Sequence, residues 1–220
     1  MKLPWRQGDA PAPAGAGVPE PTEAVGLSCR SLFKALDRCF KQDKPEILDL
    51  GPFCGSTAVY LADRGARVSV SDFQPPAPPA LDAKGKPVAD DPPGPALRID
   101  QDDAKFHLVL AWEHADFTPP ERLPEFGAEI HRVLADGGMV LLFALSNMSR
   151  EDSMARTLGR YKLSGEDKDD KIVREAVAAG GRRRYTHPTR EIERALAPLS
   201  VQGIQLQRNQ MREFLALKKT

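Results

Sequence analysis

A strand, a helix and a second strand follow one another in fewer than thirty residues, and this unit constrains the fold more than any other feature. The segment EILDLGPFCGSTAVYLADRGARVSVSDF opens with a short apolar run at 47–50, which is typical of a buried parallel strand. A glycine-containing turn leads to a helix predicted at 56–64, with Gly65 at its C-terminal stop, and RVSVSDF forms the next strand. We interpret the segment as a βαβ unit with a right-handed crossover.

The alternation of strand and helix continues and predicts an α/β sheet. FHLVLAW (106–112) and MVLLFAL (139–145) are apolar enough to be buried strands. The helix expected between them, at 119–135, has apolar residues at helical spacing. Segments 200–207 and 211–218 are joined by a short connection, which suits a terminal antiparallel pair.

Capping signals accompany the expected helices. A first helix is predicted at 23–42 from apolar residues on one face. TPPE has the form of a capping box, with Thr118 as the N-cap and Glu121 reaching back. Thr189 is expected to cap a helix at 190–197.

Two segments are too rich in proline for regular structure. Residues 1–22 are mostly Pro, Ala and Gly with scattered charges, so we expect a disordered tail and a folded domain over 23–220. Residues 74–96 hold eight prolines, which exclude a helix or a central strand and predict a long loop.

A polar insertion is predicted at 147–187, with helical pieces around 150–160 and 168–178. Inside it, the basic segment at 182–184 is suited to an anionic substrate or a phosphate. Acidic neighbours dilute that charge, so a solvated surface segment is the favoured interpretation.

Composition excludes several classes of protein. The 31 Lys and Arg residues balance 31 Asp and Glu residues, which argues against a nucleic-acid or membrane coat. Cys29, Cys39 and Cys54 lack metal-ligand spacing, so we expect reduced thiols and no metal site. No run approaches the ~18 apolar residues of a membrane span, and the N-terminus is unlike a signal peptide. These observations favour a cytoplasmic protein.

From about residue 23 to its end, the chain resembles the class I S-adenosylmethionine-dependent methyltransferases. ILDLGPFCGST is similar to the family's first motif, hhDhGxGxG, and VSVSDF to its second. EIHRVLADGGMVLLFA resembles the segment that leads into the fifth strand. The resemblance implies a three-layer sandwich around a mostly parallel, seven-stranded, Rossmann-like sheet that ends in an antiparallel strand pair. It also implies S-adenosylmethionine as cofactor and a small-molecule acceptor.

The resemblance places cofactor-binding residues at the ends of the first two strands. Gly51 and Gly55 occupy two glycine positions of the first motif, and Phe53 stands at the third. Asp49 would orient the loop through backbone N–H groups. Asp72 would accept hydrogen bonds from both ribose hydroxyls, which a carboxylate can do at once.

Further site residues precede and follow the strand at 106–112. By resemblance, Asp100 would bind the adenine amino group, although a solvated acidic turn fits as well. Trp112 would border the cofactor. His114 has the chemistry of a general base near neutral pH, and Glu113 would have it if its pKa were raised. The alternative for these three positions is a packed Trp followed by two surface polar residues.

Three functions remain open at this point. The first is an active small-molecule methyltransferase, which would work largely by placing the nucleophile in line with the methyl carbon. The second is a catalytically degenerate relative acting as a binding or regulatory protein, which Pro52, Phe53 and the loop at 74–96 favour. The third is a protein for another nucleotide-like ligand, against which the missing GxGxxG pattern argues. None of the three fixes an oligomeric state.

Overall fold

The computed structural model describes residues 24–71, 97–146, 157–163, 171–178, 184–207 and 209–220. The predictions of a disordered tail at 1–22 and of a loop at 74–96 lie outside these residues, as do Arg182 and Arg183 of the basic segment.

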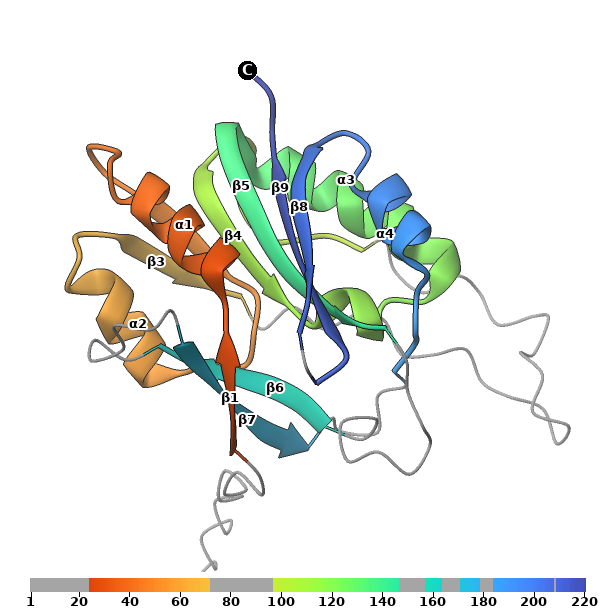
Figure 1. The fold of residues 1–220 in the computed structure, drawn as a ribbon. Coiled ribbons are helices and arrows are strands. Elements are labelled where there is room, and N and C mark those ends of the chain that lie inside the picture. The colour runs from red at the N-terminus through yellow and green to blue at the C-terminus, as the bar shows by residue number, and fades with distance from the viewer. Residues whose placement is uncertain (1–23, 72–96, 147–156, 164–170, 179–183, 208) are drawn as a thin grey trace, which may run out of the picture.

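The main sheet has six strands in the order β3-β2-β4-β5-β9-β8 (Figure 1). Their bounds are β2 (Glu46–Asp49), β3 (Arg67–Val70), β4 (Phe106–Trp112), β5 (Leu134–Leu145), β8 (Ser200–Leu206) and β9 (Met211–Leu217). The first four strands in this order are parallel, whereas β9 is antiparallel to both β5 and β8. The α/β class and the closing antiparallel pair are confirmed. The described residues form a mixed sheet of six strands, so the expected seven-stranded, mostly parallel layout is not confirmed.

The backbone of the segment just before β4 forms hydrogen bonds with side chains and not with a neighbouring strand. Leu97 and Ile99 are buried, but their N–H groups donate to the carboxylates of Glu125 and Glu129, over 3.4 and 2.9 Å. Arg132 donates back to the Ile99 carbonyl at 2.7 Å. Side chains of a helix therefore satisfy backbone groups that would otherwise need a neighbouring strand.

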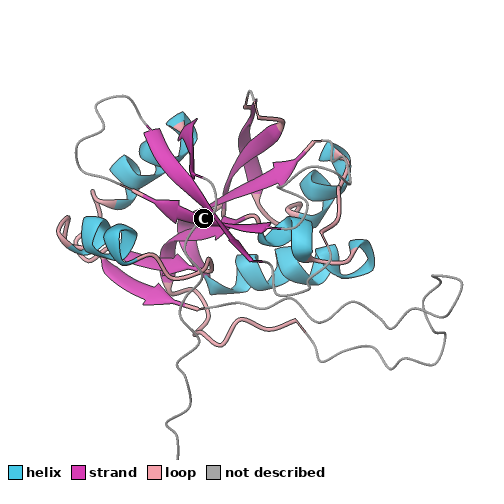
Figure 2. Cartoon of the chain, turned by 90° about the horizontal axis from the view of Figure 1, so that it is seen from below, coloured by secondary structure: helices cyan, strands magenta, loops and turns pink. Residues whose placement is uncertain are grey.

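Helices cover both faces of the main sheet (Figure 2). Their bounds are α1 (Arg30–Cys39), α2 (Gly55–Ala62), α3 (Leu123–Val133) and α4 (Thr189–Ala195), with 3-10 turns at His114–Phe117 and Pro120–Arg122. One apolar cluster packs α3 and α4 against the sheet, and a second packs α1 and α2 against the opposite face. This layering follows from β4, whose residues alternate between the two clusters.

A second, smaller sheet lies on the α1 side in the antiparallel order β1-β7-β6 (Figure 1). It consists of β1 (Ala24–Ser28), β6 (Thr157–Lys162) and β7 (Lys171–Ala178). The helix predicted from residue 23 therefore begins later, after a strand. The helical pieces predicted at 150–160 and 168–178 are wrong where the structure describes them, because β7 buries alternate residues with the period of a strand.

Neither predicted helix cap forms, because each threonine hydroxyl is engaged elsewhere. The Thr118 hydroxyl donates to the His114 carbonyl at 2.9 Å, and α3 begins only at Leu123. Thr189 is the first residue of α4, and its hydroxyl accepts from Arg212 at 2.7 Å.

Candidate functional site

The GPFCG loop, residues 51–55, leaves the carboxyl end of β2 where the strand order reverses. The chain passes from β2 to β3 on one side and later to β4 on the other side of β2. Ligands of open α/β sheets bind in the crevice beyond such a reversal. The loops after β2 and β4 are therefore the first places to look for a site.

Asp49 fixes the start of the loop. Its buried Oδ1 accepts hydrogen bonds from the Gly51 N–H at 2.9 Å and from the Trp112 indole N–H at 2.6 Å. Burial raises the pKa of Asp49 and outweighs the opposing effect of these donors. A Cβ placed on Gly51 would lie 2.4 Å from Trp112 Cδ1, so Gly51 gives close approach to Trp112.

Phe53 and Gly55 in the outer half of the loop face solvent, whereas Cys54 between them is buried. Phe53 is 61% exposed, and its ring lies 3.8 Å from the position that a Cβ on Gly55 would take. Gly55 and Ser56, the first residues of α2, are exposed as well. The next residue, Thr57, is buried. Its hydroxyl donates to the Tyr161 carbonyl at 2.6 Å, which anchors the first turn of α2 to β6.

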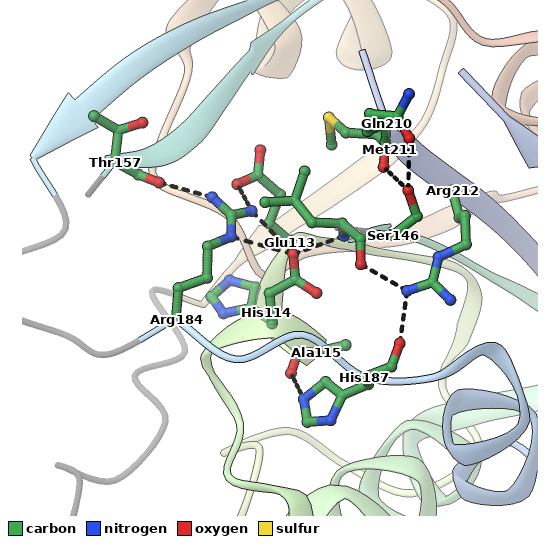
Figure 3. A network of polar contacts seen from close by, with 12 residues as sticks. Glu113, His114, Ala115, Ser146, Thr157, Arg184, His187, Gln210, Met211 and Arg212 are labelled. Carbon is green, nitrogen blue, oxygen red and sulfur yellow. Dashed lines mark hydrogen bonds and ion pairs between the residues drawn. The ribbon is translucent and has the colours of Figure 1, made fainter. Parts of the chain in front are cut away.

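Glu113 lies at the centre of a buried network of charged groups (Figure 3). Its carboxylate pairs with Arg174 of β7 at 2.5 Å, and it also contacts Arg184 and accepts from the Tyr161 hydroxyl. Burial alone would raise the pKa of Glu113, but Arg184 and Arg174 outweigh it and lower that pKa to about 2. The raised pKa required for a general base is thus absent.

Asp116 extends the network along the 3-10 turn after β4. Its Oδ2 accepts from the Leu145 N–H at 3.0 Å and from Arg184 at 3.1 Å. Burial raises the pKa of Asp116 to about 6 despite the attraction of Arg184. This carboxylate therefore titrates far closer to neutrality than Glu113.

Sequence reasoning missed Arg174, Asp116 and Tyr161. One available signal was the period-two pattern of KIVREAVA, in which Arg174 shares the inward face with Ile172 and Ala176.

The remaining predicted site residues do not share one environment. His114 is fully buried, with Nε2 against the Leu50 carbonyl, so the structure does not present it to solvent. Asp100 is exposed on the segment before β4. Asp72 lies outside the described residues. The structure thus brings Asp49, Gly51 and Trp112 together, with Phe53 and Gly55 following on the same loop.

Neither a metal site nor a membrane span is found in the part of the chain that the structure describes. No cluster of three His, Cys, Asp or Glu side chains there could hold an ion. Among the same residues, no helix has the length and apolar character needed to cross a bilayer.

Comparison with known proteins identifies one matching family model. Residues 47–138, less than half of the chain, match the model described as a methyltransferase domain. No curated protein matches the chain in sequence.

Solved structures give more distant likenesses. The PH0226 protein from Pyrococcus horikoshii OT3 is 14% identical, with 86% of this chain and 91% of that chain covered and a TM-score of 0.49. The 1,6-didemethyltoxoflavin-N1-methyltransferase of Burkholderia thailandensis is 18% identical, covering 87% and 79%, with a TM-score of 0.46. A methyltransferase from Methanosarcina mazei is 18% identical, covering 84% and 97%, with a TM-score of 0.48.

The matched segment begins in β2, contains the GPFCG loop and ends in β5. It begins with the first segment on which the sequence resemblance rests and ends within the third. Residues 47–138 are therefore similar to a methyltransferase domain, and Pro52 and Phe53 within them depart from the first-motif pattern hhDhGxGxG.

Proposed function

We propose that the chain is an S-adenosylmethionine-dependent methyltransferase that binds its cofactor over the GPFCG loop and acts on a small-molecule acceptor. The observation that carries this proposal is the exposure of Phe53, Gly55 and Ser56 at the reversal of strand order. The exposed first two residues of α2, Gly55 and Ser56, offer backbone N–H groups to a carboxylate there. Asp72, by resemblance, would hold the ribose.

The proposed reaction depends mainly on how the protein positions the acceptor relative to the methyl group. Bound S-adenosylmethionine supplies an electrophilic methyl group on a sulfonium, and the protein has to hold an acceptor in line with it. Catalysis by Glu113 or His114 stays a prediction. Both side chains are buried in the structure, and Glu113 is held ionised by two guanidinium groups. A methyl transfer that relies on alignment needs neither of them as a base.

A small-molecule acceptor agrees with a net charge of zero, which offers no general attraction to nucleic acid. A cytoplasmic location is part of the same proposal. It is supported by Cys29, Cys39 and Cys54, all free and buried, as expected in a reducing compartment.

Calorimetric titration with S-adenosylmethionine and S-adenosylhomocysteine tests the proposal. We expect both to bind, and Asp72→Ala to weaken binding by about 1–3 kcal/mol through loss of a charged hydrogen-bond partner. Asp37→Ala, on the exposed side of α1, is the matched control and should bind as the wild type does. Absence of heat at millimolar ligand would contradict the proposal.

A second candidate is a degenerate relative that binds a partner without transferring methyl groups. The position of Phe53 favours it, because the ring stands beside Gly55 at the start of α2, where the cofactor would approach. The two candidates differ in ligand affinity, so the same titration separates them.

A further inference from the structure

We propose that Trp112 is a positioning residue for the GPFCG loop: its indole holds Asp49, and Asp49 holds Gly51. The consequence for ligand affinity rests on the proposed function, whereas the holding of the loop rests on contacts within the chain. Trp112 thus acts through Asp49 and does not itself need to touch a cofactor.

The backbone of Trp112 is the first observation. Its φ is 41°, in the left-handed region that bulky side chains seldom adopt. The pairing of β4 with β5 shifts register between Leu110 and Trp112, so the strand is irregular at this point. A bulky residue persists in such a conformation only where surrounding contacts fix it, and strain of this kind concentrates at functional sites.

The contact with Asp49 is the second observation. One carboxylate oxygen accepts both the Trp112 indole N–H, at 2.6 Å, and the Gly51 N–H, at 2.9 Å. All three residues are buried. A Cβ on Gly51 would collide with the indole at 2.4 Å, so the backbone of the loop lies directly against the ring. The two residues that end β4 and begin the loop are therefore fixed by the same acceptor.

The aromatic neighbours of Trp112 are the third observation. Its ring stacks on Tyr161 of β6, with centroids 4.5 Å apart and planes at 9°. The Tyr161 carbonyl in turn accepts from Thr57 in the first turn of α2. Both ends of the loop are thus tied to β6, one through Trp112 and one through Thr57. Trp112 has little freedom to release Asp49 while β6 is in place.

The variant Trp112→Phe tests this role, because it keeps an aromatic ring and removes the N–H donor. In the ligand-free protein we expect the Gly51 amide to exchange about tenfold faster, while amides of β4 such as Val109 keep their protection. We expect the Kd for S-adenosylhomocysteine to rise about tenfold. Phe143→Leu is the matched control. It perturbs a buried ring 6.1 Å from Trp112 and leaves the Asp49 contacts intact, so both quantities should stay within about twofold of the wild type.

The variant Asp49→Ala separates positioning from packing. If Trp112 acts through Asp49, Trp112→Phe should add nothing to Gly51 exchange once Asp49 is gone. Unchanged Gly51 exchange in Trp112→Phe, or fully additive effects of the two changes, would overturn the inference. If Trp112→Phe does not fold, Asp49→Ala alone must speed Gly51 exchange, and unchanged exchange overturns the inference. A wild type that binds no S-adenosylhomocysteine would refute the proposed function, while the exchange measurements still decide the role of Trp112.

Discussion

Glu113 at the end of β4 and Arg174 in β7 form a buried ion pair, with 2.5 Å between Oε1 and Nε. Arg184 contacts the other carboxylate oxygen, and Tyr161 of β6 donates its hydroxyl to Glu113. Gly159 makes room for the cluster, since a Cβ there would lie 2.3 Å from Glu113 Oε1. The network therefore joins the small sheet to the carboxyl end of the main sheet.

Glu113→Gln should destabilise the fold by about 3–5 kcal/mol, because it removes the charge that compensates the buried guanidinium groups of Arg174 and Arg184, of which Arg184 keeps its pair with Asp116. Urea unfolding measures the effect. Arg67→Ala is the control, as Arg67 is 71% exposed in its pair with Glu46 and should cost less than about 1 kcal/mol. A loss below about 1 kcal/mol for Glu113→Gln would show that the network does not hold the sheets together.

The same carboxylate predicts a sensitivity to acid. Its pKa in the folded chain is lowered to about 2, from an ordinary value of 4.5. Its stabilising contribution is therefore fully present above pH 4.5 and is lost as the pH falls through about 2. Between pH 5 and pH 2, the free energy of unfolding should fall more steeply for the wild type than for Glu113→Gln. Parallel curves would contradict the assignment.

Glu213 predicts the opposite dependence. It is buried on β9, where its carboxylate accepts from the Leu32 N–H at 3.1 Å and from Gln207 at 3.2 Å. Burial nevertheless raises its pKa to about 7. Its favourable contribution is present below about pH 4.5 and is lost as the pH rises through 7.

Glu213→Gln should therefore remove a decline in stability between pH 5 and pH 8. Asp116, whose pKa is raised to about 6, contributes a decline of the same sign that the variant retains. Chemical denaturation at pH 5, 6.5 and 8 measures the difference. The prediction is contradicted if the difference in free energy of unfolding between the wild type and Glu213→Gln does not change from pH 5 to pH 8.

Gly127 allows α3 and α4 to approach closely. A Cβ on Gly127 would lie 1.8 Å from the Ala195 carbonyl oxygen, a contact that only movement of a helix can relieve. We expect Gly127→Ala to lose about 1–3 kcal/mol to overpacking, more than the roughly 1 kcal/mol that alanine gains within a helix. Thermal unfolding measures the effect. Gly203→Ala is the control, because a Cβ on Gly203 would have nothing within 4 Å. Equal melting temperatures for the two variants would contradict this.

The predictions from sequence succeeded where burial is continuous along the chain. FHLVLAW forms β4 over the predicted residues because it is buried on both faces and so carries an unbroken apolar signal. β7 was misread because two adjacent charged residues, Arg174 and Glu175, obscure the period-two pattern of KIVREAVA. The inward position of Arg174 makes sense only through Glu113, which lies 61 residues earlier.

The loop shows the same limit. Asp49 was expected to orient backbone N–H groups, and its bond to Gly51 agrees with that local expectation. Its second donor, Trp112, lies 63 residues away, and the sequence placed it only as a border of the cofactor. Long-range polar contacts leave no periodic trace, which is why the hydrogen-bonded core of the site was largely invisible.

Phe53 supplies the last prediction. Its ring is 61% exposed and lies 3.8 Å from the Cβ position of Gly55, so it stands on the solvent side of the loop at the start of α2. We expect Phe53→Gly to strengthen binding of S-adenosylhomocysteine about tenfold, because it restores an open backbone where the ring now stands. The greater flexibility of a glycine loop would offset part of that gain.

Calorimetry on the two proteins measures this change, with Val59→Ala as the control for losing an exposed apolar side chain from α2. Weaker binding by Phe53→Gly would mean that the ring walls the site and contacts the ligand. Should Phe53→Gly and Asp72→Ala both leave a measurable wild-type affinity unchanged, the ligand binds elsewhere and the placement of the site at this loop is wrong.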